Sequence, residues 1–413
     1  MSQPSQYHSY IDELLLQSSQ GDLFFDEQIQ VEPIKLTPAE RDRRDSSHAA
    51  ICEFFSRARE IFQRCVLSQT ESTLTKLLVN DSVHQVPQRF YHDLPKAVWT
   101  NPVFFRTDES RSGKIFEIQC PGSGWGDMLL LGSLYRDHCN DSSLISHDPR
   151  TGVIEAIQTE CNSPSPSVLH LLDNSSNPSS MHYLIRCTQP PLRYWGYSKG
   201  VRNSECEFIR SHSVYGLIAE NLFRHRLALA ADGMLRFDLP PLVIFDQKMI
   251  LCLPFLDETK NEFSDGLRDI LAYTYPVSPS GFRDTNGEWV TIEAFLKRKP
   301  RSRKYFLKYG GCDTNLNWGS RSVYRLDSES APEHFEQAVQ DYQKDRPWVI
   351  QPDLANKEKI TYFSRESCEP KVGTLTAKYS TFYGPNGPLG VRTHHRQGTK
   401  VHGQPDAVVG LAL

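Results

Sequence analysis

The sequence predicts an α+β (α/β) protein, in which mixed sheets are flanked by helices and a mainly helical segment comes first. Two patterns predict this class. From about residue 94 onward β-prone runs alternate with helical runs, and upstream of them apolar residues recur with helical spacing. The length of 413 residues allows two or three domains with a large core. The chain shows no internal repeat, so a solenoid or propeller is not expected.

The first predicted element is a helix that begins at Thr37. Thr37 is a suitable N-cap, Pro38 occupies the first helical position, and Glu40 completes a capping box. The apolar stripe that follows predicts a buried helix face, with or without a break, and more helix is expected up to about residue 92. The stripe consists of Ile51, Phe54, Phe55, Ala58, Ile61, Phe62 and Val66. We assign it to the core.

The central part of the chain contains strand-like runs separated by loops and helices. Segments rich in Ser, Asn and Pro at 141–166 and 173–180 are typical of loops. Helices are expected at 127–139 and 204–231, where apolar residues follow helical spacing. Short apolar runs predict strands. These runs cover 103–106, 114–119, 167–172, 181–187, and the two arms of a hairpin at 241–245 and 249–253.

Composition limits the classes of partner. A formal net charge of −4 argues against a general nucleic-acid binder, which needs a clustered basic surplus. No apolar run is long enough to span a bilayer, and the polar residues 1–10 do not resemble a signal peptide. Ten cysteines are scattered without a C-x-x-C pair, which favours a reducing compartment. We therefore expect a cytoplasmic protein that acts on small molecules, with no nucleic acid or membrane as partner.

The most informative stretch is the predicted hairpin at 103–119. Arg106 and Asp108 are two residues apart on one strand and share a face, as do Glu117 and Gln119 on the next strand. If the strands pair, two carboxylates, one amide oxygen and one guanidinium converge. Oxygen ligands of this kind suit Mg²⁺, and Arg106 could hold a phosphate through two hydrogen bonds. The simpler alternative is that these side chains face water.

A second polar constellation lies far downstream, where a strand ends at Lys308 and a glycine-bearing loop follows. Such a loop can place backbone N–H groups against phosphate oxygens, and the lysine supplies a positive charge. The loop residues concerned are Gly310, Gly311, Asn315, Asn317, Gly319 and Ser320. The loop is neither a Walker A loop nor a Rossmann turn, and an ordinary β-turn is the alternative.

Three more segments could belong to a site. An apolar strand at 348–351 leads through Gln351 into a polar linker, where the main chain could read a nucleotide base. A later strand, after a Gly/Pro-rich turn, carries Arg392. Near the first hairpin, the loop of Ser123, Gly124 and Trp125 could offer N–H donors to a substrate carboxylate, or it could be an ordinary loop.

Four of these elements, in chain order, resemble the circularly permuted ATP-grasp ligases of the glutathionylspermidine-synthase-like and eukaryotic glutathione-synthetase-like groups. They are the hairpin at 103–119, the Lys308 strand with its loop, the strand at 348–351 and the strand that carries Arg392. The family's Arg-x-Asp and Glu-x-Asn strands are similar to 106–108 and 117–119, with Gln119 in place of Asn. The resemblance spans about residues 100–413. It implies a metal-strand and substrate-binding α/β region at 96–235 and an ATP-grasp nucleotide-binding region at 236–413. A mainly helical region at 1–95, which the resemblance does not explain, comes before them.

The resemblance implies a role for each matched residue. The implied catalytic residues, which contact phosphate or a substrate carboxylate, are Arg106 and Arg392. The implied Mg²⁺ ligands are Asp108, Glu117 and Gln119. The implied ATP-binding residues are Lys308, the six loop residues named above, Gln351 at the adenine hinge, and a second lysine upstream of the loop. The candidates for that second lysine are Lys297, Lys299 and Lys304.

The activity that the resemblance implies is ATP- and Mg²⁺-dependent joining of a carboxylate to an amine through an acyl phosphate, on an amino acid or small peptide. A mobile loop at 310–320 would close over ATP and exclude water. Homodimers are frequent in the family, so a homodimer is one expectation. Two alternatives stay open: an ATP-dependent phosphotransferase of the same fold, and an ATP-grasp-like binding protein without turnover.

Overall fold

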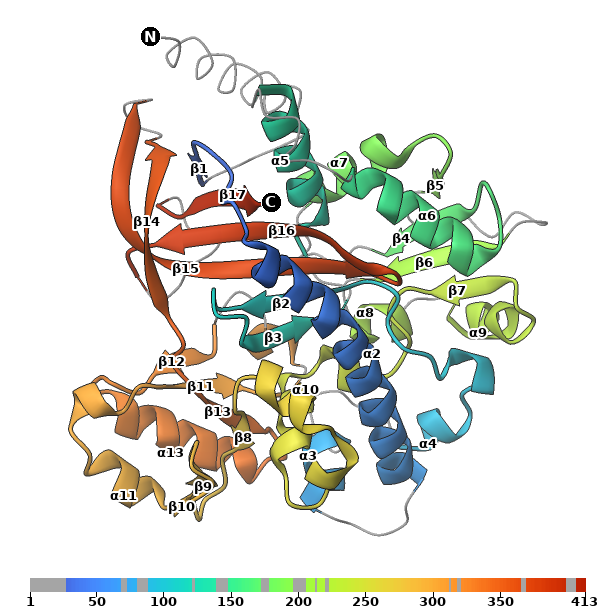
Figure 1. Ribbon diagram of the computed structural model, residues 1–413. Coiled ribbons are helices and arrows are strands. Elements are labelled where there is room, and N and C mark those ends of the chain that lie inside the picture. The colour runs from blue at the N-terminus through green and yellow to red at the C-terminus, as the bar shows by residue number, and fades with distance from the viewer. Residues whose placement is uncertain are drawn as a thin grey trace.

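The computed structural model describes residues 27–67, 73–79, 88–120, 123–138, 148–171, 178–195, 206–211, 214–219, 223–311, 313–317, 321–364, 369–398 and 406–413. Over these residues the chain forms several sheets flanked by helices, which agrees with the predicted class (Figure 1). The helices are α2 (Pro38–Leu67), α3 (Thr73–Leu78), α4 (Gln88–His92), α5 (Trp125–His138), α6 (Pro149–Cys161), α7 (Pro178–Thr188), α8 (Val214–Ile218), α9 (Phe223–Ala231), α10 (Asp265–Ile270), α11 (Ile292–Leu296), α12 (Thr314–Asn317) and α13 (Ala331–Tyr342). In these ranges no helix is long and apolar enough to cross a membrane.

The largest sheet has seven strands in the order β14-β1-β17-β16-β15-β2-β3. Strand β14 pairs with both β1 and β15, so the strands from β14 to β15 close into a ring, and the β2–β3 hairpin extends from β15. This is possible because β15 is 15 residues long: its first half pairs with β14 and its second half with β2. The strands are β1 (Gln28–Gln30), β2 (Phe105–Glu109), β3 (Ile115–Gln119), β14 (Asn356–Phe363), β15 (Pro370–Gly384), β16 (Gly387–Arg396) and β17 (Val408–Ala412).

Helix α2 begins where the sequence predicts and runs unbroken to Leu67. The backbone N–H and the hydroxyl of Thr37 donate to Glu40 Oε2 at 2.8 and 2.9 Å, and the Glu40 N–H donates to Thr37 Oγ1 at 3.2 Å. These contacts close the predicted capping box. Every residue of the predicted stripe is buried. The helix lies across the large sheet (Figure 1).

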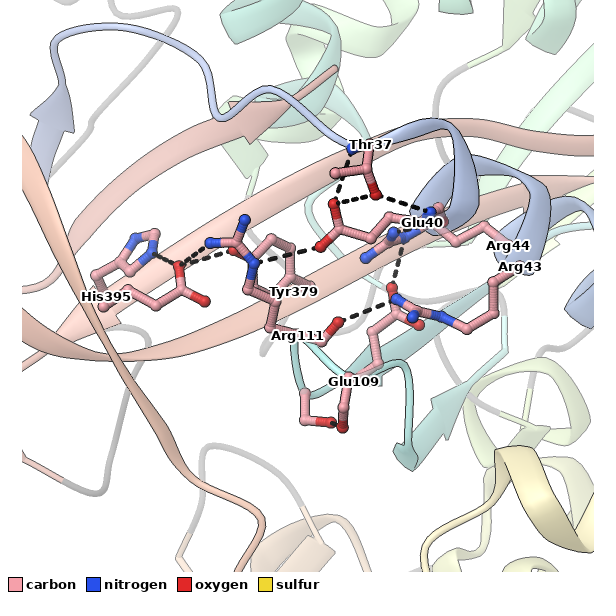
Figure 2. Close-up of polar contacts among 11 residues, drawn as sticks. Thr37, Glu40, Arg43, Arg44, Glu109, Arg111, Tyr379 and His395 are labelled. Carbon is pink, nitrogen blue, oxygen red and sulfur yellow. Dashed lines mark hydrogen bonds and ion pairs between the residues drawn. The ribbon is translucent and has the colours of Figure 1, made fainter.

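An ionic network ties α2 to one face of the large sheet (Figure 2). Arg44 Nε donates to Glu109 Oε1 on β2 at 2.7 Å. Arg111, in the turn between β2 and β3, approaches Glu40 Oε1 at 3.2 Å and Glu358 Oε2 on β14 at 3.6 Å. The helix, the hairpin turn and the sheet are therefore fastened together on this face, which we call the α2 face.

Two further sheets complete the fold. An antiparallel sheet, β12-β11-β13-β8, carries α13 against it, and the two-stranded pair β10–β9 lies nearby. A parallel sheet has the order β5-β4-β6-β7, with α6 and α9 beside it. The bounds are β4 (Ser167–Leu171), β5 (Arg193–Trp195), β6 (Glu207–Ser211), β7 (Leu235–Phe237), β8 (Tyr275–Pro276), β9 (Phe282–Arg283), β10 (Trp289–Val290), β11 (Tyr305–Tyr309), β12 (Val323–Arg325) and β13 (Trp348–Pro352).

Several central elements differ from the prediction. The expected loops at 141–166 and 173–180 contain helix α6 and the start of α7, and the expected strand at 181–187 lies within α7. The signals for α6 were an Asp148 N-cap, whose side chain accepts from the Arg150 N–H, and Pro149 at the first helical position. Ser, Asn and Pro around it concealed this start.

The expected helix at 204–231 is confirmed only in α8 and α9, and the expected hairpin at 241–253 is wrong. The first is strand β6 followed by α8 and α9. All five β6 residues are buried, so the strand lacks the alternation that would have identified it. The second is a pair of 3₁₀ helices, η3 (Val243–Asp246) and η4 (Lys248–Phe255), in which nearly every apolar side chain is buried. The division of the chain at residues 95 and 235 remains a prediction.

Candidate functional site

The predicted hairpin is present, and its register brings the four polar side chains into two opposite pairs. Asp108 lies opposite Glu117, and Arg106 lies opposite Gln119. Beyond β2, Ser380 of β15 lies opposite Asp108. Because side chains alternate along a strand, this set points away from the α2 face, where the neighbouring Glu109 lies.

A cavity of about 450 Å³ lies between this face and the β12-β11-β13-β8 sheet. Asp108, Glu117 and Lys378 line it from the large sheet, and Lys308 and Gln351 line it from the other. Aromatic surface comes from Phe116, Phe306 and Tyr324. Small-molecule sites typically have volumes of about 300 to 1,000 Å³ and combine apolar walls with a few polar groups. The cavity has both properties.

Asp108 is buried in a closed set of hydrogen bonds. Arg106 donates from Nε to Oδ1 at 2.9 Å and from Nη2 to Oδ2 at 3.1 Å. Lys378 Nζ donates to Oδ2 at 2.8 Å, and Ser380 Oγ donates to Oδ1 at 2.7 Å. The remaining end of the Arg106 guanidinium, Nη1, donates to the Ser123 carbonyl at 2.7 Å. The structure thus places Arg106 and Asp108 at one site, in contact with each other.

Glu117 meets cations from elsewhere in the chain. Lys248, at the start of η4, lies 3.4 Å from Glu117 Oε1, and Gln119 Nε2 donates to the same oxygen at 3.0 Å. Burial raises the pKa of Glu117, but the ammonium groups of Lys248, Lys308 and Lys378 outweigh burial and lower it to about 2. Glu117 is therefore an anion at any working pH.

Lys308 is buried on β11 and points across the cavity toward the hairpin. Its Nζ donates to Gln351 Oε1 at 2.6 Å and to the Phe116 carbonyl of β3 at 3.5 Å. Gln351 in turn donates to Thr274 Oγ1 at 2.8 Å. Burial, the largest cause, lowers the pKa of Lys308 to about 8 in spite of the nearby Glu117 carboxylate. Gln351 holds the lysine in place, and both residues also line the cavity.

The loop after β11 is only partly described. Gly310 packs against neighbouring strands: its N–H donates to the Pro347 carbonyl at 2.8 Å and its carbonyl accepts from the Met249 N–H at 2.9 Å. Gly311 is buried beside it. Asn317 Nδ2 donates to the Asp246 carbonyl at 2.8 Å, and its side-chain oxygen accepts from Lys248. Gly319, Ser320 and the side chain of Asn315 lie outside the described residues.

Arg392 and the predicted substrate loop meet at the N-terminus of α5. Arg392 Nη1 donates to Asp127 Oδ2 at 2.8 Å and Nη2 lies 3.4 Å from Glu27 Oε2. Gly124 has φ +88°, which favours glycine, and a Cβ added there would lie 2.8 Å from Arg392 Nη1, so the guanidinium would have to shift. Trp125 is packed in the core, where its ring centroid lies 4.9 Å from that of Phe382.

The sequence reading missed two lysines that the structure brings to the site, Lys248 and Lys378. The lysine proposed upstream of the loop, Lys304, is exposed and does not line the cavity, and Lys297 and Lys299 are exposed as well. A signal for Lys378 was available. Lys378 is a charged residue on a β-prone run and lies two residues before Ser380, so both side chains occupy the same face of the strand.

Mg²⁺, which the sequence resemblance implies, fits these residues poorly. Mg²⁺ demands near-octahedral oxygen ligands, usually one or two carboxylates with substrate phosphates. Both oxygens of Asp108 already accept from Arg106, Lys378 and Ser380. Within the described part of the chain, no three His, Cys, Asp or Glu side chains gather in a way that could hold a metal ion. Glu117 could meet a metal that arrives on a nucleotide, but Asp108 is not available.

Comparison with known proteins establishes the fold. No protein-family model and no curated protein matches the chain. Among solved structures, the chain is similar to a glutathione synthetase-like effector from Globodera pallida, in its apo form. The TM-score is 0.55 and the identity 10%, over 99% of this chain and 96% of that one. The chain thus shares its overall fold. A structure named "Putative gamma-glutamylcysteine synthetase" from Methylobacillus flagellatus aligns with a TM-score of 0.37 and 9% identity, over 73% of this chain and 78% of that one.

Proposed function

We propose that this protein is an ATP-dependent carboxylate–amine ligase with permuted ATP-grasp order, acting on an amino acid or small peptide. One observation carries the proposal. The lysine strand β11 and the earlier Arg-x-Asp and Glu-x-Gln strands bound a single cavity, and Lys308 Nζ reaches the Phe116 carbonyl at 3.5 Å. The protein from Globodera pallida that shares the fold is named a glutathione synthetase-like effector, which supports this class of reaction.

The chemistry needs positive charge around a phosphate chain. A substrate carboxylate oxygen attacks the γ-phosphorus of ATP, and the bond to ADP breaks. An amine then attacks the acyl carbon, phosphate leaves, and an amide and a proton are formed. Arg106 and Lys378 contact Asp108, Lys248 contacts Glu117, and Lys308 interacts with both carboxylates electrostatically. These four cations would neutralise the phosphate charge. The aromatic wall would hold the base and exclude water from the acyl phosphate.

A binding protein without turnover is the second candidate, because Asp108 is enclosed by donors. A coupled assay that measures ADP release in the presence of a panel of amino acids and amines separates the two candidates, because of these two only a ligase releases ADP. We expect Lys308→Ala to reduce ADP release at least about a hundredfold, since a buried charge is lost from the phosphate site. Lys304→Ala is the matched control, because Lys304 is exposed, lies four residues away and does not line the cavity. Full activity of Lys308→Ala would refute the site.

The mass of the product distinguishes a ligase from a phosphotransferase of the same fold. A ligase releases ADP and phosphate and yields an amide whose mass is the sum of both substrates less one water. A phosphotransferase yields a phosphorylated substrate and no free phosphate. If calorimetry shows no binding of a non-hydrolysable ATP analogue under any condition, the proposal that this protein binds a nucleotide is wrong.

A further inference from the structure

Asp108 holds as many hydrogen bonds as a carboxylate can accept. Each of its two oxygens accepts one bond from Arg106 and one more from either Lys378 or Ser380. The side chains of Asp108 and Lys378 are only 1% and 6% exposed. A metal ion could reach Asp108 only by displacing one of these four donors, three of which come from a buried ammonium or guanidinium.

Lys378 occupies its position because of the strand register. Ser380 lies opposite Asp108, and Lys378 is two residues earlier on β15, so both side chains face the cavity. Tyr379, between them, points to the α2 face, where its hydroxyl donates to Glu358 Oε2 at 2.8 Å (Figure 2). Lys378 therefore could not leave Asp108 by a rotation of the strand without breaking the contacts of Tyr379 on the other face.

The described side chains around the cavity carry a surplus of positive charge. Three carboxylates, Asp108, Glu117 and Asp353, meet six cations: Arg106, Lys248, Lys308, Arg321, Arg325 and Lys378. The surplus attracts a phosphate chain and repels a free divalent cation. The Lys378 ammonium has three N–H donors and uses one of them for Asp108, so two donors can bind phosphate oxygens.

We propose that the Lys378 ammonium replaces a protein-held metal ion at Asp108, so that this protein binds a nucleoside triphosphate chiefly through fixed cations and depends only weakly on Mg²⁺ for affinity. The choice of ATP as the ligand rests on the proposed function. Mg²⁺ that arrives with the nucleotide would meet Glu117 and the phosphates, but not Asp108.

The test is calorimetric binding of a non-hydrolysable ATP analogue and of inorganic tripolyphosphate to the full chain, in excess EDTA and in excess Mg²⁺. For the unmodified protein we expect the Kd in EDTA to lie within about threefold of the Kd in Mg²⁺. Lys378→Gln removes the ammonium and frees Asp108 for a metal. Its Kd in EDTA should rise by about ten- to a hundredfold, the usual value of a charge-assisted hydrogen bond, and Mg²⁺ should restore much of the affinity. Lys371→Gln, an exposed lysine on the same strand, is the control and should change neither value.

Three outcomes decide the matter. If the unmodified protein needs Mg²⁺ for binding by tenfold or more, the inference is wrong while the proposed function stands. If neither the analogue nor tripolyphosphate binds under either condition, the proposed function and the inference both fail. Weak Mg²⁺ dependence of the unmodified protein supports the inference even if Lys378→Gln does not fold, because that comparison needs no variant.

Discussion

Arg44 of α2 and Glu109 of β2 form a buried ion pair, with Nε 2.7 Å from Oε1 and both side chains 2% exposed. Glu109 follows Asp108 directly but points to the opposite face of the sheet. The pair therefore fixes the position of the strand that carries Asp108 from the side away from the cavity.

Removal of one partner of this pair should be strongly destabilising. We expect Arg44→Met to lower the free energy of unfolding by about 3 to 5 kcal/mol, because it leaves the Glu109 carboxylate buried without its cation. Arg64→Met is the matched control: Arg64, on the same helix, pairs with Glu262 and is 57% exposed, so about 0 to 1 kcal/mol is expected. Urea unfolding measures both values. Equal losses for the two variants would show that the Arg44 pair does not brace the strand.

The low pKa of Lys308 predicts an alkaline limit for nucleotide binding. Burial lowers this pKa to about 8, so the side chain is charged below pH 8 and loses its proton above it. A phosphate binds the charged form. Affinity for an ATP analogue should thus be level up to about pH 7 and fall above pH 8, by at most about tenfold per pH unit for one linked proton. Lys308→Arg should remove this slope between pH 7 and 9, since arginine stays protonated.

Gln351 should set the pH at which that limit appears. Its Oε1 accepts from Lys308 Nζ at 2.6 Å, so Gln351→Glu places a carboxylate against the ammonium and raises the pKa of Lys308. We expect the alkaline fall in affinity to move upward by about one pH unit or more. Gln340→Glu, on the exposed side of α13, is the control and should leave the profile unchanged. An unchanged profile in Gln351→Glu would mean that another group sets the limit.

Gly124 should be intolerant of a side chain for two separate reasons. Its φ is +88°, and an added Cβ would lie 2.8 Å from Arg392 Nη1. Gly124→Ala should therefore destabilise the protein by more than the roughly 1 kcal/mol expected from backbone strain alone. Gly233→Ala isolates the strain, because Gly233 has φ +75° and no atom within 4 Å of an added Cβ. If thermal unfolding shows equal losses, the contact with Arg392 has no energetic consequence.

Local patterns in the sequence were sufficient for the helix at Thr37, the β2–β3 hairpin and the lysine strand β11. In each case a short-range signal decides the structure: a capping box, alternation around a polar turn, or an apolar run that ends in a charged residue. The same reasoning failed for β6 and η4. In β6 polar and apolar residues alike are buried, and η4 is a nearly continuous apolar run, so neither shows a period from which to choose between helix and strand.

The sequence by itself determined which polar side chains share a face, because alternation along a strand is a local property: Arg106 with Asp108, and Glu117 with Gln119. Only the tertiary structure decided what surrounds them. Lys378 reaches Asp108 from 270 residues away along the chain, through the pairing of β15 with β2. Strand pairing over such a distance depends on the packing of the whole sheet, which no local pattern records. The contact matters most for the site, because it places an ammonium where the sequence predicted a metal ion.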